Sequence, residues 1–231
     1  MMKMARSILM NGFEAVPRMV MTAHNTAVFL QDPQRYWVDD EYGFLATVRR
    51  RGTASEFHEY FAQLDDLLPN MQRVIDGARR LDLPVIYSIW GPREPGEISA
   101  LQRAVGAAFT AGSPEAEIVE DVIPRGGDTI SHRSGLSAFS EPDLTLQLRR
   151  LGVENILVVG LLIEYGLRST VYDASDRGFR PLVVDDACIG LTYDARSTAL
   201  DEMKFGLTKV RSTGETLEIL QRLGRGDPVL V

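Results

Sequence analysis

An acidic residue at the end of an apolar strand is the first candidate for chemistry in this sequence. Asp32 ends the apolar run NTAVFLQD at positions 25–32, and a second carboxylate, Glu164, lies in VVGLLIEYGLRSTVYDASDRGF at positions 158–179. That second segment reads as an apolar strand, a tight bend and a helix, where many hydrolytic enzymes hold a nucleophile. The position that would face a pocket is Gly166, which has no side chain. Any chemistry must therefore use other groups, although an Asp-Pro pair at a strand end is also a common turn former.

Thiol and metal chemistry are poorly supported by the sequence. Cys188 is the only cysteine, which excludes an intrachain disulfide and a zinc site built from cysteines. It follows the run VVDDA at a strand end, and buried cysteines are commonly inert. His24, His58 and His132 are scattered over different elements. We therefore expect neither a metal ion nor a cofactor.

Helices and strands that alternate along the chain must position these residues. Apolar runs predict strands at 25–32, 84–90, about 128–132, 155–161, 180–187 and 208–213. Helical spacing predicts helices over 71–81, 144–151, about 166–177, about 194–206 and 214–223. Alternation of this kind, with continuously apolar strands, indicates a parallel sheet covered on both faces. We predict an α/β three-layer sandwich with a mostly parallel, Rossmann-like sheet of about six strands, which places ligands at the strands' carboxyl ends.

The helix before the strand at 155–161 carries clear signals for its ends. Ser140 with Asp143 resembles a capping box, and Leu144 opens an apolar stripe. Gly152 can end the helix. We therefore expect a helix that starts with a side-chain cap close to Leu144.

The length of the chain favours one domain. A chain of 231 residues with 45% hydrophobic content can bury one substantial core, so we expect a single domain over 1–231. Residues 1–23 form an expected N-terminal extension. Residues 38–67 form an expected insertion after the Asp32 strand, where a lid over a ligand would lie.

Charge and hydropathy narrow the class of partner. The formal net charge of −7 argues against a nucleic-acid surface, which needs a concentrated cationic face. Arg49, Arg50 and Arg51 make the only basic run, and we interpret it as a solvated loop. No apolar run approaches the roughly 20 residues of a membrane span, and the N-terminal segment is unlike a signal peptide. These features favour a small-molecule ligand, no membrane contact and a cytoplasmic location.

Four segments in the correct order resemble the isochorismatase-like family, also called the cysteine hydrolase superfamily. They are VFLQDPQRYW, LPNMQRVIDGARRLDLPVIYSIW, RSGLSAF and GLLIEYGLRSTVYDASDRGFRPLVVDDAC. The similarity covers about residues 24 to 220. It implies the same α/β fold and a hydrolytic activity.

The resemblance also implies which positions carry the chemistry. Most such enzymes cleave amides with an Asp, a Lys and a nucleophilic Cys. By position, Asp32 takes the place of the Asp, Arg133 that of the Lys and Gly166 that of the Cys. Only the aspartate is retained, so the chain is most similar to the isochorismatases that lack the nucleophilic cysteine and hydrolyse a vinyl ether. The sequence QRYW after Asp32 resembles their pattern as well.

The retained aspartate has several possible roles. Asp32 could donate a proton if burial or a like charge raised its pKa, and Glu164 is the candidate for that like charge. Arg133 could hold Asp32 ionised, or it could clamp a substrate carboxylate and leave Asp32 as a general base toward water. We expect Asp32, Arg133 and Glu164 to form the catalytic group.

The resemblance leaves the substrate and the assembly open. Residues expected to contact a small cyclic or carboxylated substrate are Gln34, Trp37, Trp90, Leu162, Tyr165 and Gly166. Such a substrate would have a vinyl ether or a C–N bond and belong to secondary metabolism or catabolism. By family analogy we expect a homodimer or homotetramer. An alternative is a catalytically inactive protein of this fold that binds a small molecule or a protein partner.

Overall fold

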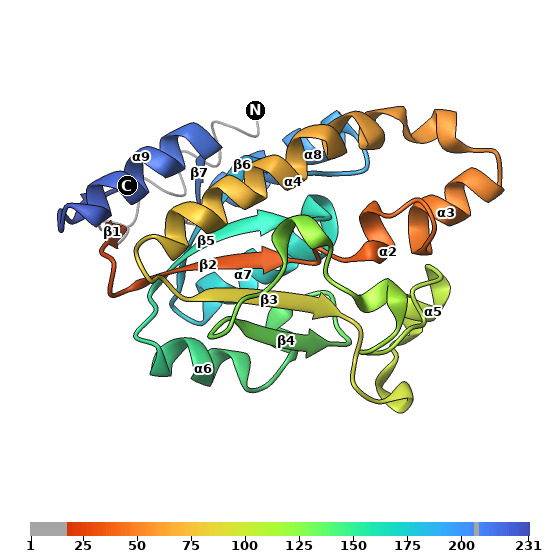
Figure 1. The fold of residues 1–231 in the computed structure, drawn as a ribbon, viewed down its shortest axis with the longest axis horizontal. Helices are drawn as coiled ribbons and strands as arrows, with labels where there is room; N and C mark the ends of the chain where they lie inside the picture. Colours follow the sequence, from red (N-terminus) through yellow and green to blue (C-terminus); the bar gives the residue numbers. More distant parts are fainter. Residues whose placement is uncertain (1–17, 206–207) are drawn as a thin grey trace.

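A six-stranded parallel sheet forms the centre of the computed structural model, which describes residues 18–205 and 208–231 (Figure 1). The strands lie in the order β4-β3-β2-β5-β6-β7, and every neighbouring pair is parallel. Their bounds are β2 (Thr26–Gln31), β3 (Val85–Trp90), β4 (Thr129–Arg133), β5 (Asn155–Gly160), β6 (Arg180–Cys188) and β7 (Lys209–Arg211). Each of the six expected strands is present, and the predicted α/β class is confirmed.

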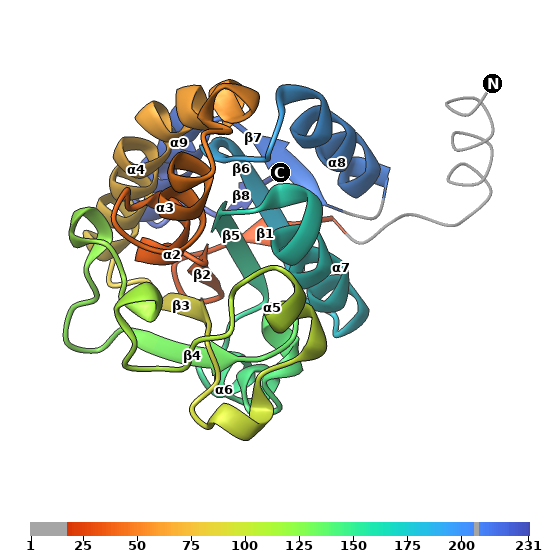
Figure 2. The same cartoon turned by 90° about the vertical axis from the view of Figure 1, so that its right-hand side faces the viewer.

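Helices cover both faces of this sheet, which makes the three layers (Figure 2). The long helices α4 (His58–Arg79) and α9 (Thr213–Gly224) pack on one face, and α6 (Leu144–Arg150), α7 (Arg168–Asp176) and α8 (Tyr193–Phe205) pack on the other. Three shorter helices, α2 (Arg35–Val38), α3 (Gly43–Arg50) and α5 (Ala100–Ala104), lie beyond the carboxyl ends of the strands. Within the described residues, no helix combines the length and apolar character that crossing a membrane requires.

Alternation along the central strand explains why its middle, residues 27–30, is apolar at every position. Val28 and Leu30 of β2 point into the core beneath α4 and α9, whereas Ala27 and Phe29 point into the core beneath α6, α7 and α8. All six residues of β2 are buried. A strand that is covered on both faces needs apolar side chains at consecutive positions, which is the pattern the sequence shows.

Residues 38–67, the expected insertion, are mostly continuous with the rest of the fold. They include α3 and the first ten residues of α4, which begins at His58 rather than near the predicted start at 71. Tyr60 and Leu67 of that early part are fully buried, and the Tyr60 hydroxyl donates to the Trp37 carbonyl at 2.8 Å. Pro69 lies inside the helix and removes one of its hydrogen bonds. Burial on both sides of the proline stabilises one long helix, which local sequence signals did not predict.

The expected capping box at the start of α6 is wrong. Asp143 is the N-terminal cap of α6, but its side chain makes no capping hydrogen bond. The Ser140 hydroxyl instead accepts from the Gly135 N–H at 3.2 Å, within the preceding loop. A local contact within this loop therefore takes the serine that would otherwise cap the helix.

A small second sheet joins the two ends of the described chain. Strand β1 (Val20–Met21) pairs antiparallel with β8 (Val229–Leu230). Met21 is fully buried there. The end of the expected extension at 1–23 therefore belongs to the fold, while residues 1–17 lie outside the described residues.

Candidate active site

A cavity of about 310 Å³ opens at the carboxyl ends of the central strands, where α2, α3 and α5 lie in Figures 1 and 2. Parallel α/β sheets bind ligands at this edge. The cavity is mainly apolar, with one carboxylate and one guanidinium at its wall. Its lining residues are Asp32, Tyr36, Trp37, Phe44, Trp90, Leu101, Val105, Arg133, Leu136, Leu162, Tyr165, Gly166 and Leu191.

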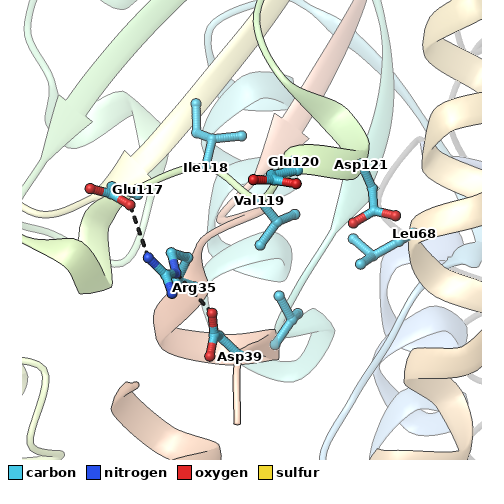
Figure 3. Close-up of a pocket in the computed structure, with 9 residues that line it drawn as sticks. Arg35, Asp39, Leu68, Glu117, Ile118, Val119, Glu120 and Asp121 are labelled. Carbon is cyan, nitrogen blue, oxygen red and sulfur yellow. Dashed lines mark hydrogen bonds and ion pairs between the residues drawn. The ribbon is translucent and has the colours of Figure 1, made fainter. Parts of the chain in front are cut away.

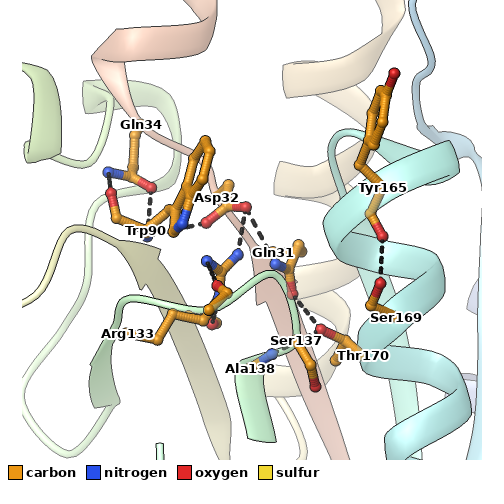
Figure 4. A network of polar contacts seen from close by, with 12 residues as sticks. Gln31, Asp32, Gln34, Trp90, Arg133, Ser137, Ala138, Tyr165, Ser169 and Thr170 are labelled. Carbon is orange, nitrogen blue, oxygen red and sulfur yellow. Dashed lines mark hydrogen bonds and ion pairs between the residues drawn. The ribbon is translucent and has the colours of Figure 1, made fainter. Parts of the chain in front are cut away.

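Asp32 is held at the end of β2 by three hydrogen-bond donors. Its Oδ1 accepts from the Trp90 N–H at 3.0 Å, and its Oδ2 accepts from Gln31 Nε2 at 3.1 Å and from Arg133 Nη2 at 2.5 Å (Figure 4). The side chain is only 3% exposed. The backbone has a φ of 52°, a left-handed conformation that aspartate tolerates better than most residues. Such conformations cost about 1–3 kcal/mol and often occur at functional sites.

Arg133 is directed at Asp32, and each of its three nitrogens donates to an acceptor within the protein. Its Nε donates to Ser88 Oγ at 2.9 Å and its Nη1 donates to the Gly135 carbonyl at 3.0 Å, while Nη2 binds Asp32. The guanidinium is 2% exposed. The structure thus brings two of the three expected catalytic residues together, and the geometry favours the hypothesis that Arg133 orients Asp32.

Opposing influences act on the protonation of Asp32. Burial raises the pKa of this carboxyl above its usual range, while the Arg133 charge and the hydrogen bonds from Gln31, Arg133 and Trp90 lower it. The net shift is upward. A carboxylate with a raised pKa is a stronger base than aspartate in water, and it remains close to the charge that stabilises its ionised form.

A buried polar chain supports Asp32 from behind. Gln31 Nε2 donates to Asp32, Gln31 Oε1 accepts from the Thr170 hydroxyl at 3.0 Å, and Thr170 accepts from the Ala138 N–H at 2.9 Å (Figure 4). Gln31 and Thr170 are fully buried. The sequence analysis missed both residues, although a glutamine that ends an apolar strand next to the aspartate was a usable signal.

Gly166 lies directly in front of the ion pair. It belongs to a π-helical turn, Ile163–Leu167, between β5 and α7. A Cβ at this position would lie 3.1 Å from Gln31 Nε2, 3.2 Å from the Leu136 carbonyl and 3.5 Å from Arg133 Nη2. A side chain there would face Asp32 and Arg133 at close range. The glycine itself supplies no side chain at this point of the site.

Glycine is required at one further position beside the site. Gly160 ends β5 with a φ of 129°, opposite Gln31 in the sheet. A Cβ there would collide with the Gln31 carbonyl. The missing side chain lets β5 come close to the end of β2, so the π-helical turn can reach Asp32.

Glu164 does not lie beside Asp32, so the structure does not bring together the expected carboxylate pair. Its Oε1 accepts from the Leu191 N–H at 2.8 Å, and it is absent from the residues that line the cavity. Burial raises the pKa of Glu164, but the charges that act on Asp32 do not include it. The direction of the side chain follows the π-helical turn, in which residues 164 and 166 face different ways. Glu164 positions Leu191, which does line the cavity.

Gln34, which we expected to contact the substrate, does not line the cavity. Its Nε2 donates to the Trp90 carbonyl at 3.2 Å, and its Oε1 accepts from the Trp90 N–H at 2.8 Å (Figure 4). Both polar atoms of this fully buried amide are used within the protein. Gln34 fixes the backbone of Trp90 at the cavity and does not line it.

The other expected contact residues, Trp37, Trp90, Leu162, Tyr165 and Gly166, all line the cavity. The indole rings of Trp37 and Trp90 are nearly parallel, with an angle of 6° and centroids 6.1 Å apart. Tyr36 packs edge-on against Trp37 at 4.7 Å. Sequence reasoning missed Tyr36 and Phe44, because only the bend of the chain after β2 turns them to the same side.

Cys188 is remote from this chemistry. The thiol is 1% exposed, its Sγ lies 3.6 Å from the Val158 carbonyl, and it does not line the cavity. Burial raises the pKa of Cys188 far above its usual range, which keeps it protonated. Thiols that are buried in apolar surroundings are generally inert.

A second depression of about 410 Å³ lies on the outer side of α2 and is polar (Figure 3). Its only cation, Arg35, is paired with Asp39 at 2.8 Å and with Glu117 at 3.1 Å. Glu120 and Asp121 add further negative charge. We assign no chemistry to it. Elsewhere in the described parts of the chain, no three His, Cys, Asp or Glu side chains lie close enough together to hold a metal ion.

The fold and the site define the class of protein. A doubly covered parallel sheet with a buried carboxylate and an apolar cavity at its carboxyl edge has the arrangement of an α/β enzyme. The model of the isochorismatase domain matches residues 26–215. The chain therefore belongs to the isochorismatase family and is a hydrolase of that family.

Individual relatives agree with this assignment. An uncharacterised isochorismatase family protein, YwoC of Bacillus subtilis, is 30% identical over 161 residues, covering 68% of this chain and 84% of the relative. Nicotinamidase 3 of Arabidopsis thaliana is 24% identical over 143 residues, covering 61% of this chain and 72% of the relative. The crystal structure of a cysteine hydrolase from Pseudomonas syringae pv. phaseolicola has the same fold, with a TM-score of 0.76 and 19% identity over 91% of this chain and 99% of that one.

Proposed function

We propose that this protein hydrolyses a small, cyclic or planar substrate by proton transfer through Asp32, without a covalent enzyme intermediate. The observation that carries the proposal is the ion pair of Asp32 and Arg133 at the wall of an apolar cavity, with Gly166 in front of it. The scissile bond would be a vinyl ether or a C–N bond.

Water is the nucleophile in this proposal. Gly166 has no attacking group, and the thiol of Cys188 is enclosed elsewhere. The three donors that converge on Asp32 favour its carboxylate form, which can accept a proton from water. After a C–N bond breaks, the same carboxyl can return that proton to the leaving amine. A vinyl ether would instead require the protonated form of Asp32 to donate to the enol-ether carbon, after which water adds to the oxocarbenium ion and returns a proton to the carboxylate.

The lining of the cavity supports a small substrate with a flat ring. About 310 Å³ is near the lower end of the usual range for ligand pockets, roughly 300–1,000 Å³. Trp37, Trp90, Tyr36 and Phe44 supply aromatic faces and edges. Such surfaces bind planar rings well and exclude water from the reacting bond.

A panel of substrates tests the proposal. The first prediction concerns the buried cysteine, Cys188. Cys188→Ser is expected to hydrolyse the substrate within about twofold of the wild-type rate, because the thiol does not reach the cavity. The panel contains nicotinamide as a planar amide and isochorismate as a cyclic vinyl ether, with product measured by chromatography. Intact mass spectrometry during a single turnover should show no adduct. Loss of turnover in Cys188→Ser without loss of folding, or an adduct on the protein, would refute a mechanism without a thiol.

A second prediction concerns the pH dependence of kcat/KM. Toward a C–N substrate Asp32 acts as a general base and must be unprotonated, so activity on that substrate should fall as the pH decreases through the pKa of Asp32. Because burial raises this pKa, the acidic limb should lie above the usual value of about 3.9. Glu164→Gln is the control, since its amide can still accept from Leu191, and it should keep the same limb. A limb at or below the usual value would contradict a base in this environment, and a shift in Glu164→Gln would restore Glu164 to the catalytic group.

The earlier alternative, an inactive protein that binds a small molecule or a protein partner, predicts binding without turnover across the panel. No particular feature of the site favours it, since Asp32 has its donors in place. The homodimer or homotetramer, the cytoplasmic location and the role in secondary metabolism or catabolism stay predictions.

A further inference from the structure

A larger cavity of about 610 Å³ adjoins the aromatic one, and its walls contain two arginines. We call it the outer cavity. It is formed by α3, the segment 51–57 and the end of α5. Its lining residues are Tyr36, Phe44, Thr47, Val48, Arg51, Thr53, Glu56, Phe57, Arg103, Ala104, Val105 and Gly106.

The two cavities share three of their walls, Tyr36, Phe44 and Val105. The Tyr36 hydroxyl donates to the Val105 carbonyl at 3.0 Å, so this pair forms the partition between them. Val105 itself is 48% exposed. A ligand whose ring lies against Trp37 and Trp90 can therefore extend over the partition into the outer cavity.

The basic run at 49–51 separates into three different environments. Arg49 pairs with Asp40 at 2.8 Å, and Arg50 donates to the Ala46 carbonyl and to the Thr47 hydroxyl. Arg51 alone lines the outer cavity, and its guanidinium has no partner within the described parts of the chain. Arg49 and Arg50 are exposed as expected, but they end helix α3, so the prediction of a loop is wrong for them.

Arg103 adds a second cation to the same cavity. Among the described residues its side chain makes one hydrogen bond, from Nη2 to the Ile98 carbonyl at 3.2 Å, which uses one of its five N–H donors. Glu56 is the one acidic residue among the walls, so two positive charges face one negative charge. In a chain with a net charge of −7, this cationic cavity beside the candidate active site would attract an anion.

We propose that the outer cavity binds a carboxylate at the end of the substrate, through Arg51 and Arg103. The substrate class is then an elongated acid, with a planar ring in the aromatic cavity and a chain that carries the carboxylate across the partition. A planar guanidinium matches a carboxylate in shape as well as in charge. This inference rests on the proposed function for the ring and the scissile bond, and adds the anionic end.

Tryptophan fluorescence provides a direct test. The chain has two tryptophans, Trp37 and Trp90, and both line the aromatic cavity. The probes are phenylacetate, phenylpropionate, phenylbutyrate and phenylpentanoate, each compared with the phenylalkanol of the same length. Once the chain is long enough to cross the partition, the acid should bind about tenfold more tightly than the alcohol.

Neighbouring variants separate a bound carboxylate from a general charge effect. Arg51→Gln and Arg103→Gln should each remove most of the preference for the acid, while Glu56→Gln should increase it about twofold. Arg50→Gln is the matched control. Arg50 is the neighbour of Arg51 in the chain and has the same charge, but its side chain does not line the outer cavity. Its replacement should leave the preference unchanged.

Three outcomes would overturn the proposal. They are equal affinities for acid and alcohol at every length, equal losses in Arg50→Gln and Arg51→Gln, and no fluorescence response to either series. Because the titration measures binding, it is repeated in Asp32→Asn. Retained preference for the acid in this variant, without turnover, would support the outer cavity independently of the catalytic step. Turnover by the wild-type protein without that preference would overturn the outer cavity and leave the role of Asp32 intact.

Discussion

Asp32→Asn is expected to lower kcat/KM by about a hundredfold to ten-thousandfold, the usual contribution of a positioned acid or base. Asparagine has nearly the same shape and its oxygen can still accept hydrogen bonds from the surrounding donors. It cannot take a proton from water. The loss should therefore appear mainly in kcat, with KM little changed, measured by steady-state kinetics on whichever substrate the panel identifies.

The matched control for Asp32→Asn is Asp39→Asn. Asp39 lies just past the end of α2, close to Asp32 in the chain. It lines the second, polar depression, not the candidate active site, and pairs with Arg35 (Figure 3). Its replacement should change kcat/KM very little. Activity of Asp32→Asn within about tenfold of wild type, with the fold shown intact by circular dichroism, would exclude Asp32 as the proton-transfer group.

Arg133→Met is expected to lower the free energy of unfolding by about 3–5 kcal/mol at neutral pH. Methionine fills similar space but leaves the Asp32 carboxylate buried without its charge partner. Gln31 and Trp90 would then be its only donors. Urea denaturation followed by circular dichroism measures the loss.

The pH dependence of this loss provides a second signature. In Arg133→Met the pKa of Asp32 in the folded state should rise further, because burial then acts with less opposition. Relative to the unfolded chain, the protonated carboxyl is favoured at low pH and the buried carboxylate is penalised as the pH rises through the folded pKa. The destabilisation should therefore be smaller near pH 4 than at pH 7.

Two further variants make the interpretation of Arg133→Met specific. Arg49→Met breaks an exposed ion pair with Asp40, whose side chains are 51% and 60% exposed, and should cost at most about 1 kcal/mol. Adding Asp32→Asn to Arg133→Met removes the unpaired charge and should recover part of the stability. Equal losses of unfolding free energy in Arg49→Met and Arg133→Met would show that the buried ion pair stabilises the fold no more than an exposed one.

The guanidinium of Arg133 has a structural consequence that a smaller cation would not reproduce. It connects three strand ends, since it lies at the end of β4 and binds Ser88 of β3 and Asp32 after β2. Each of its nitrogens has a different acceptor. This planar geometry holds the carboxylate in one orientation against the cavity, which is the condition for efficient proton transfer.

Much of the framework follows from the sequence alone. The sequence predicts all six strands of the main sheet, and the apolar runs are clearest in β2, β3, β5 and β6, which are buried over most of their length. The position of Asp32 at the end of such a strand also predicts the edge at which it lies, since parallel strands end together. The family resemblance is carried by the same segments. Arg133 could be matched to Asp32 through the resemblance of the segment RSGLSAF to the family's motif.

Only the tertiary structure decided what the polar side chains do with each other. Gln34 and Glu164 each lie two residues from a residue that lines the cavity. Even so, Gln34 binds the backbone of Trp90, and Glu164 binds the backbone of Leu191. Gln31 became part of the site through Thr170, which is 139 residues away in the chain. Sequence spacing determines which residues reach one edge of a sheet. The direction of each side chain depends on competing partners from distant segments, and those partners are adjacent only after the chain has folded.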